Sequence, residues 1–336
     1  MLIAAVGAAT LVPAGIVAAD PAGPTDYEAV IVDMAAADPS TTVPDGVTVS
    51  IEGHDSFVWL RLAAGLTAAV PGYDGEPYLR IDADGSVWRN RLSWSAWYNE
   101  DRYGDVERPD FVDPNATPEW ESIDDDSSVA WHDHRIHLMD PTPPIGAEPG
   151  DVVLTSLLPF TVDGIDVELR VETTLIGDPS TRPSLGGVMI GVAVMAAFIV
   201  FGGRRVGGLT VLAVSAAVLA TVVGGVQYLS QPIDTGPDRL WLALPVAALA
   251  TGVVGVMLDR SGRWFWATGS ALLSGVLVGW WAIDRWSVFT AALIPTALPG
   301  SFDRMVTAAA AVIALGASLG ALGVLVKPGG ASVDQR

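Results

Sequence analysis

Three of the four histidines of this 336-residue chain lie within one short segment. His132, His134 and His137 occur in the run Trp-His-Asp-His-Arg-Ile-His, and Met139 follows two residues later. Imidazole nitrogens are ligands for copper and zinc, and thioether sulfur is a ligand for copper. The segment therefore predicts a metal site, and an oxidising location outside the cell favours copper over zinc.

The spacing of these histidines limits how they can meet. If residues 129–139 form a strand, His132 and His134 share one face, whereas His137 and Met139 lie on the other. The i, i+2 pair can then converge on one ion, and a third ligand must come from elsewhere. His54, in a Gly-His-Asp turn, is the only other imidazole. We predict that His132 and His134 bind the ion, assisted by His54 or His137, with Met139 contributing through a bulge.

A purely structural role for the same histidines is the alternative. They would hydrogen-bond to acidic neighbours, pack beside Trp131 and hold a sheet against a loop. Catalysis has little support, because no Ser-His-Asp order, nucleophile elbow, phosphate loop or paired-carboxylate motif stands out. The chain has no cysteine, which excludes thiol chemistry and thiolate ligands. We therefore predict a protein that is not an enzyme.

Charge and hydropathy divide the chain into two halves. Residues 20–184 hold 32 acidic and 9 basic side chains, whereas the rest holds 6 acidic and 9 basic. The acidic half repels nucleic acid and suits cations or basic partners, although a salt-adapted host would also give such a surface. Residues 1–19 are apolar and end in Val-Ala-Ala, which predicts a signal peptide.

Five apolar stretches are long enough to cross a bilayer: 185–202, 206–228, 240–258, 264–283 and 305–326. Basic residues follow the first, third and fifth: Arg204 and Arg205, Arg260 and Arg263, and Lys327 with Arg336. The positive-inside rule makes that side cytoplasmic. We predict a multi-pass protein of the cell membrane, with its N-terminal domain outside the cell and its C-terminus inside. The middle of each span lacks ionisable residues, which argues against an ion pump.

The acidic half predicts an all-β domain. Short runs with period-two alternation occur at 47–51, 56–62, 78–82 and 86–90. Asp-Gly pairs at 84–85 and 163–164 are hairpin turn signals. We therefore expect an immunoglobulin-like or related β-sandwich over residues 20–182, then a membrane bundle over 183–327 and a short tail at 328–336. An aromatic segment at 94–103 either forms a binding surface or caps the sandwich.

Several motifs of the β domain occur in an order that resembles a known family. They are Gly-Glu-Pro-Tyr-Leu-Arg-Ile at 75–81, Asp-Gly-Ser-Val at 84–87 with Asn90, Asn99 with Arg102, Pro118 with Trp120, and the histidine run at 131–137 with Met139. They resemble an uncharacterised, mainly actinobacterial family of exported, membrane-anchored proteins. Leu138 departs from that pattern, which has an aromatic residue there. The resemblance covers about half the chain. It implies the architecture but no particular activity.

Two functional hypotheses follow from these patterns. The first is a non-enzymatic module, anchored in the lipid bilayer, that binds or assembles with other envelope proteins. The second is a copper- or zinc-binding or delivery protein of the cell envelope that uses His132 and His134.

Overall fold

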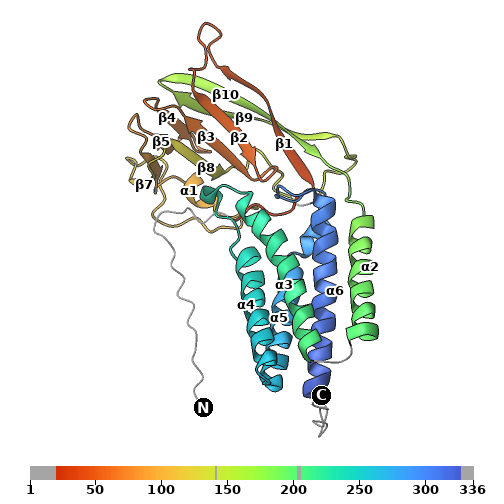
Figure 1. Ribbon diagram of the computed structural model, residues 1–336. Coiled ribbons are helices and arrows are strands. Elements are labelled where there is room, and N and C mark those ends of the chain that lie inside the picture. Colours follow the sequence, from red (N-terminus) through yellow and green to blue (C-terminus); the bar gives the residue numbers. More distant parts are fainter. Residues whose placement is uncertain (1–19, 141, 203–205, 327–336) are drawn as a thin grey trace.

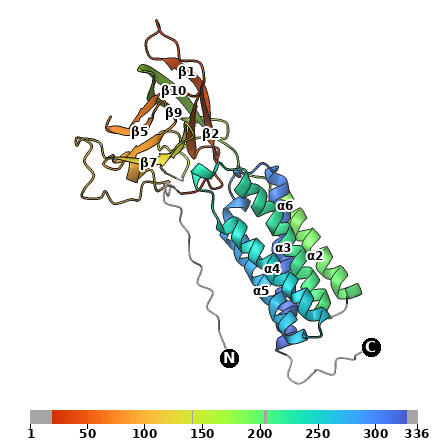
Figure 2. The same ribbon diagram turned by 60° about the vertical axis from the view of Figure 1, so that its left-hand side comes forward.

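The computed structural model describes residues 20–140, 142–202 and 206–326. Figures 1 and 2 show two parts, a β domain built from the first half of the chain and a bundle of long helices built from the second. The predicted architecture, a β-sandwich followed by five apolar helices, is confirmed. The predicted signal peptide at 1–19 and tail at 328–336 lie outside the described residues.

The β domain consists of two antiparallel sheets that share one hydrophobic core. The larger sheet has the strand order β1-β10-β9-β4-β5-β6-β7, and the smaller has the order β2-β3-β8. The strands are β1 (Tyr27–Ala36), β2 (Val47–Glu52), β3 (Phe57–Leu62), β4 (Ala68–Pro71), β5 (Pro77–Ile81), β6 (Val87–Asn90), β7 (Trp120–Asp124), β8 (Ser128–His132), β9 (Val152–Val162) and β10 (Ile165–Leu175).

Local sequence explains two hairpins of the larger sheet. Both predicted hairpins are present, joining β5 to β6 and β9 to β10. Asp163 and Gly164 both have positive φ, as a tight two-residue turn between antiparallel strands requires. Along β10, Val167, Leu169 and Val171 are buried and the residues between them are not, so the period-two pattern marks the core face.

The predicted strand over 129–139 is wrong beyond its first residues, because β8 ends at His132. Asp133 causes the break. One of its carboxylate oxygens accepts from the backbone N–H of Arg135, and its carbonyl accepts from the N–H of Ile136 at 3.1 Å. This aspartate-centred turn satisfies backbone groups that would otherwise pair with a strand. Residues 133–137 therefore fold back instead of alternating.

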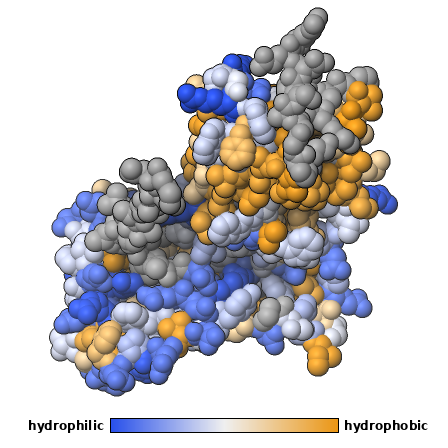
Figure 3. Space-filling view, turned by 90° about the horizontal axis from the view of Figure 1, so that it is seen from below, coloured by the Kyte–Doolittle hydropathy of each residue, from blue (hydrophilic) through white to orange (hydrophobic). Residues whose placement is uncertain are grey.

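Within the described residues, the second half forms five helices that meet the length and hydropathy of membrane spans. They are α2 (Arg182–Ala197), which continues into a π-helical turn (Phe198–Gly202), α3 (Val206–Leu229), α4 (Leu240–Arg260), α5 (Trp264–Asp284) and α6 (Gly300–Leu325). Apolar side chains gather over the helices and hydrophilic ones over the β domain (Figure 3). The chain is thus a multi-pass membrane protein.

The fifth span begins five residues earlier than predicted, at Gly300, and so includes two charged residues. Asp303 accepts two hydrogen bonds from the guanidinium of Arg285, and both side chains are fully buried. Arg304 donates to the carbonyl oxygens of Val288 and Ala291. These charges lie at the end of the bundle nearest the β domain, and pairing makes their burial possible.

The segment between α5 and α6 joins the two halves of the molecule. Thr25 forms an isolated antiparallel bridge with Leu293, and the Asp26 carboxylate accepts from the N–H of Ala292 at 2.7 Å. The segment between α5 and α6 is therefore one part of the membrane half on which the β domain rests (Figure 2).

Candidate metal centre

The small sheet and the turn after it position three histidines. β3 pairs with β8 so that Phe57 lies opposite His132, the last residue of that strand. The chain then turns at Asp133 and returns toward the strand, which brings His134 and His137 beside His132. One ring nitrogen from each of the three imidazoles lies within 4.8 Å of the others.

The structure therefore corrects the predicted separation of His137 from the His132 and His134 pair. The ring centroids of His132 and His137 are 4.7 Å apart, and His134 lies 5.1 Å from the first and 5.2 Å from the second. Strand alternation would have placed His137 on the opposite face. The turn at Asp133 removes that alternation, so the three imidazoles lie beside one another.

Backbone carbonyls hold two of these rings in a defined orientation. Nδ1 of His132 lies 2.6 Å from the carbonyl oxygen of Ser56, and Nδ1 of His137 lies 2.9 Å from that of Leu138. A carbonyl oxygen only accepts, so each Nδ1 must carry the proton of its ring. The remaining nitrogens, Nε2 of His132 and Nε2 of His137, face each other at 2.9 Å.

The third ring lies between a tyrosine and a thioether. Nε2 of His134 lies 3.1 Å from the carbonyl oxygen of Tyr98 and therefore donates to it, while Nδ1 lies 2.6 Å from Sδ of Met139. The Tyr98 ring stacks on the His134 ring at a centroid distance of 4.3 Å. Met139, which we predicted to contribute through a bulge, reaches the cluster through the turn.

Burial makes the three imidazoles poor bases. His132, His134 and His137 are 3%, 8% and 1% exposed. Burial, followed by the neighbouring His137 and His134, holds the pKa of His132 well below its usual value, and burial also lowers the pKa of His134. For His137, burial and the positive charge of Arg102 lower the pKa to about 3. All three rings are neutral at neutral pH.

The neighbouring acidic residue does not point at the cluster. The Asp133 carboxylate accepts from the indole N–H of Trp131 at 2.8 Å and from the Arg135 guanidinium at 2.7 and 2.9 Å. Burial alone would raise the pKa of Asp133, but the hydrogen bonds and charge of Arg135 outweigh it and lower that pKa. Asp133 therefore shapes the turn and leaves the imidazoles as the donor set.

The fourth histidine does not join this group. His54 lies in the β2–β3 turn, and its Nε2 is 3.1 Å from the carbonyl oxygen of Ile294 in the segment before α6. Among the described residues, the group with metal-binding spacing contains His132, His134 and His137 and not His54. The expectation that His54 supplies the third ligand therefore has no geometric support, whereas the expectation for His137 does.

Sequence reasoning did not identify the residues that frame the cluster. Tyr98 belongs to the short helix α1 (Ser95–Tyr98), inside the aromatic segment that we considered as a binding surface or a cap. Tyr73 accepts from the backbone N–H of His134 at 2.9 Å. The aromatic content of 94–103 was the available signal, but only the fold shows that this segment packs onto the histidines.

A β-sandwich with a buried cluster of three neutral imidazoles, attached to five apolar helices, defines the chain as a multi-pass membrane protein with a candidate metal centre in its β domain. No protein-family model, curated protein or solved structure matches the chain.

Proposed function

We propose that this chain is a membrane-anchored copper-binding protein of the cell envelope, in which His132, His134 and His137 hold the ion. The observation that carries the proposal is the contact between Nε2 of His132 and Nε2 of His137 at 2.9 Å. Each of these rings gives its proton to a backbone carbonyl. Two lone pairs therefore face each other in a buried site.

A metal ion between the two Nε2 atoms would remove the repulsion between their lone pairs. Two lone pairs at this distance repel each other, and moving a proton between them would break a carbonyl hydrogen bond or charge a buried ring. A metal with nitrogen ligands at about 2.0 Å and tetrahedral angles places two such nitrogens about 3.3 Å apart. The rings need to move apart by only a few tenths of an ångström. Carbonyl bonds at the opposite ring nitrogen are also the usual way in which proteins orient metal-binding histidines.

The sulfur of Met139 favours copper over zinc. Its Sδ lies against Nδ1 of His134. A soft sulfur donor is therefore next to a cluster of imidazoles, whose nitrogens are intermediate between hard and soft donors. Thioether sulfur binds Cu(I) far better than it binds Zn²⁺. Copper also suits a site without cysteine in an oxidising location. Copper is thus the proposed ligand of the non-enzymatic module predicted from the sequence, and the proposed function is to bind or deliver copper.

We further propose that the β domain lies outside the cell and the C-terminus inside. Arg260 and Arg263 flank the α4–α5 turn, at the end of the bundle away from the β domain (Figure 1). The positive-inside rule makes that end cytoplasmic. The other two basic groups used in the prediction, Arg204 with Arg205 and Lys327 with Arg336, lie outside the described residues.

The test is a metal titration of the full chain in detergent micelles. Cu(I) is titrated without oxygen against a chromogenic chelator, and Cu²⁺ and Zn²⁺ are titrated in parallel. We expect one tightly bound copper ion per chain. His137→Gln and His132→Gln should each weaken copper binding by about 100-fold or more. Substitution of residues that only hold a ligand in position already lowers metal affinity by about 10- to 100-fold.

His54→Gln is the matched control, because it removes an imidazole that lies outside the cluster. Its copper affinity should equal that of the wild type. Circular dichroism of each variant establishes that it is folded. A folded wild-type chain that binds no stoichiometric copper, or a His132→Gln and His137→Gln double variant with unchanged affinity, would overturn the proposal.

A further inference from the structure

A stack of three aromatic rings begins at the histidine cluster. The Tyr98 ring lies on the His134 ring at a centroid distance of 4.3 Å, with 21° between the ring planes. The Trp94 ring lies on the Tyr98 ring at 5.2 Å and 26°. Offset stacking at such distances brings π systems into van der Waals contact. The rings of His134, Tyr98 and Trp94 therefore form one continuous series of π contacts that starts at a candidate metal ligand.

Helix α1 holds the two outer rings in this arrangement. Trp94 caps the helix and Tyr98 is its last residue. Residues four positions apart lie on the same side of a helix, so their side chains can stack. The backbone carbonyl of Tyr98 also accepts the hydrogen bond from Nε2 of His134 at 3.1 Å. Tyr98 thus contacts His134 twice, through its ring and through its backbone.

The stack runs from the buried cluster to the surface of the β domain. His134 is 8% exposed, whereas Tyr98 and Trp94 are half-buried. The exposed side chain of Arg108 places its guanidinium carbon 5.6 Å from the centre of the Trp94 ring. Trp94 is therefore the outer end of the stack, where a molecule in solution can approach it.

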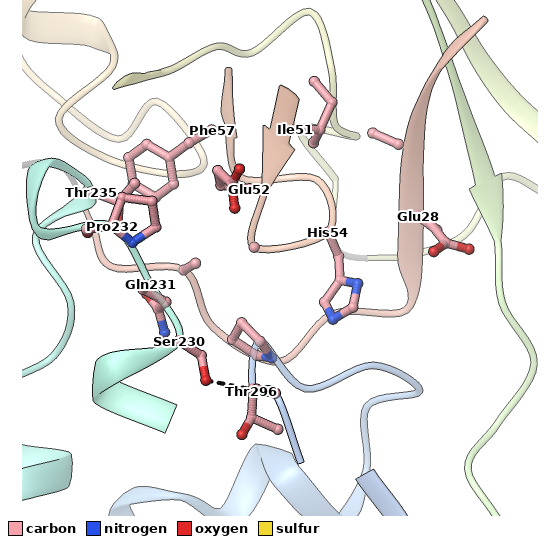
Figure 4. Close-up of a pocket in the computed structure, with 15 residues that line it drawn as sticks. Glu28, Ile51, Glu52, His54, Phe57, Ser230, Gln231, Pro232, Thr235 and Thr296 are labelled. Carbon is pink, nitrogen blue, oxygen red and sulfur yellow. Dashed lines mark hydrogen bonds between the residues drawn. The ribbon is translucent and has the colours of Figure 1, made fainter. Parts of the chain in front are cut away.

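Two other rings that contact the cluster do not stack on it. Tyr73 meets His134 edge-on, at a centroid distance of 6.0 Å, and Phe57 meets His132 edge-on at 5.8 Å. Phe57 is buried and lines a pocket of about 350 Å³ between the β domain and the helices (Figure 4). Edge-on contacts give less overlap between π systems than stacking does. Of these three neighbours, Tyr98 is therefore the one best coupled to an imidazole.

On the basis of the proposed copper site, we propose that this stack carries single electrons between the copper ion and a one-electron oxidant at the surface beside Trp94. Cu(I) loses one electron and becomes Cu(II), and the oxidant is reduced by that electron. The rings provide the path and are not themselves oxidised, so no bond breaks and no proton moves. A one-electron reductant returns the site to Cu(I). Imidazole and thioether ligands suit this cycle because both occur at copper sites that transfer electrons.

The experiment places a photo-oxidant beside Trp94 in the copper-loaded full chain. The chain has no cysteine, so Glu107→Cys, at an exposed position next to Arg108, provides a single thiol for a ruthenium tris-bipyridine maleimide. A laser flash with a soluble quencher produces Ru(III), and its return to Ru(II) is followed together with the formation of Cu(II). We expect a phase whose rate is independent of protein concentration. The zinc-loaded protein should lack this phase.

Substitutions in this labelled protein locate the path. Trp94→Leu and Tyr98→Leu should each slow the phase at least about tenfold, which equals about 1.4 kcal/mol of activation free energy. Tyr98→Phe keeps a stacked ring and should keep the rate. Trp97→Leu is the matched control, because Trp97 belongs to the same helix but packs edge-on against Phe111. Trp97→Leu and Phe57→Leu should transfer the electron as fast as the labelled protein without them.

The copper bound per chain is measured on every sample before the flash, which separates two kinds of failure. A labelled protein that binds no copper would overturn the copper-binding proposal and this one with it. Copper-loaded Trp94→Leu and Tyr98→Leu variants that react at the unchanged rate would overturn the electron path alone. Equal slowing by Trp97→Leu would also overturn it, because the effect would then come from a general disturbance of the helix.

Discussion

Nε2 of His132 and Nε2 of His137 face each other at 2.9 Å, and each ring is held from behind by a backbone carbonyl. The two residues are five positions apart, on either side of the turn at Asp133. The contact therefore depends on where β8 ends. It also orients both imidazoles toward one point before any ion arrives, which lowers the reorganisation that binding requires.

Met139→Leu tests the choice of metal. Leucine has a similar volume, so the turn should remain folded, but the soft donor beside His134 is lost. We expect Cu(I) affinity to fall about tenfold while Zn²⁺ affinity changes little. Competition titrations with both ions measure this ratio. Equal losses for the two metals would mean that Met139 acts through packing alone.

Asp133→Asn tests the turn that gathers the histidines. The substitution leaves the Arg135 guanidinium without its buried counter-charge and weakens the bonds that end β8. The free energy of unfolding should fall by about 3 kcal/mol, and copper affinity should fall with it. Denaturant unfolding of the β domain in the full chain measures the first quantity. Asp110→Asn, at an exposed carboxylate, is the control and should change neither.

The depressed pKa of His137 predicts acid sensitivity of the metal-free protein. Burial and Arg102 lower this pKa from 6.5 to about 3 in the folded state. Between these values the unfolded chain binds a proton that the folded chain does not, so stability is full above pH 6.5 and is lost as the pH falls toward 3. His137→Gln should show a weaker loss than the wild type when unfolding is compared at neutral pH and about pH 5 with a chelator present. Parallel curves for the two proteins would contradict this assignment.

The buried ion pair of the bundle predicts a strong asymmetry between single and double substitutions. Asp303→Leu leaves Arg285 charged and without its partner in a fully buried position, so the bundle should lose about 3–5 kcal/mol of stability. Arg285→Met combined with Asp303→Leu removes both charges and should recover most of that loss. Thermal unfolding in detergent compares the three proteins. If the double variant is no more stable than the single one, the loss of stability does not come from leaving the Arg285 charge without its partner.

The absence of cysteine makes the orientation simple to test. Single-cysteine variants Ile145→Cys, at a fully exposed site of the β domain, and Ser261→Cys, in the α4–α5 turn, each introduce one reactive thiol. In intact cells a membrane-impermeant maleimide should label the first and not the second. Permeabilised cells should label both. Labelling of Ser261→Cys alone in intact cells would reverse the proposed topology.

Local patterns were sufficient where one physical rule governs a whole segment. Apolar stretches of about twenty residues predicted the membrane helices, because hydrocarbon tolerates little else. Asp-Gly pairs predicted both hairpins because few residues accept their backbone angles. The start of α6 was missed since Asp303 and Arg304 look unsuitable for a span until Arg285 and the carbonyls of the preceding loop are brought beside them.

The sequence by itself determined the two-part architecture and the clustering of His132, His134 and His137 in one segment of the acidic half. Only the tertiary structure decided which of them meet. The period-two rule assumes a continuous strand, whereas the hydrogen bonds of Asp133 end the strand at His132 and return the chain. Of the two assisting ligands that the sequence left open, that turn brings His137 and not His54 beside His132 and His134. Convergence of side chains depends on the path of the backbone and not on spacing along the chain.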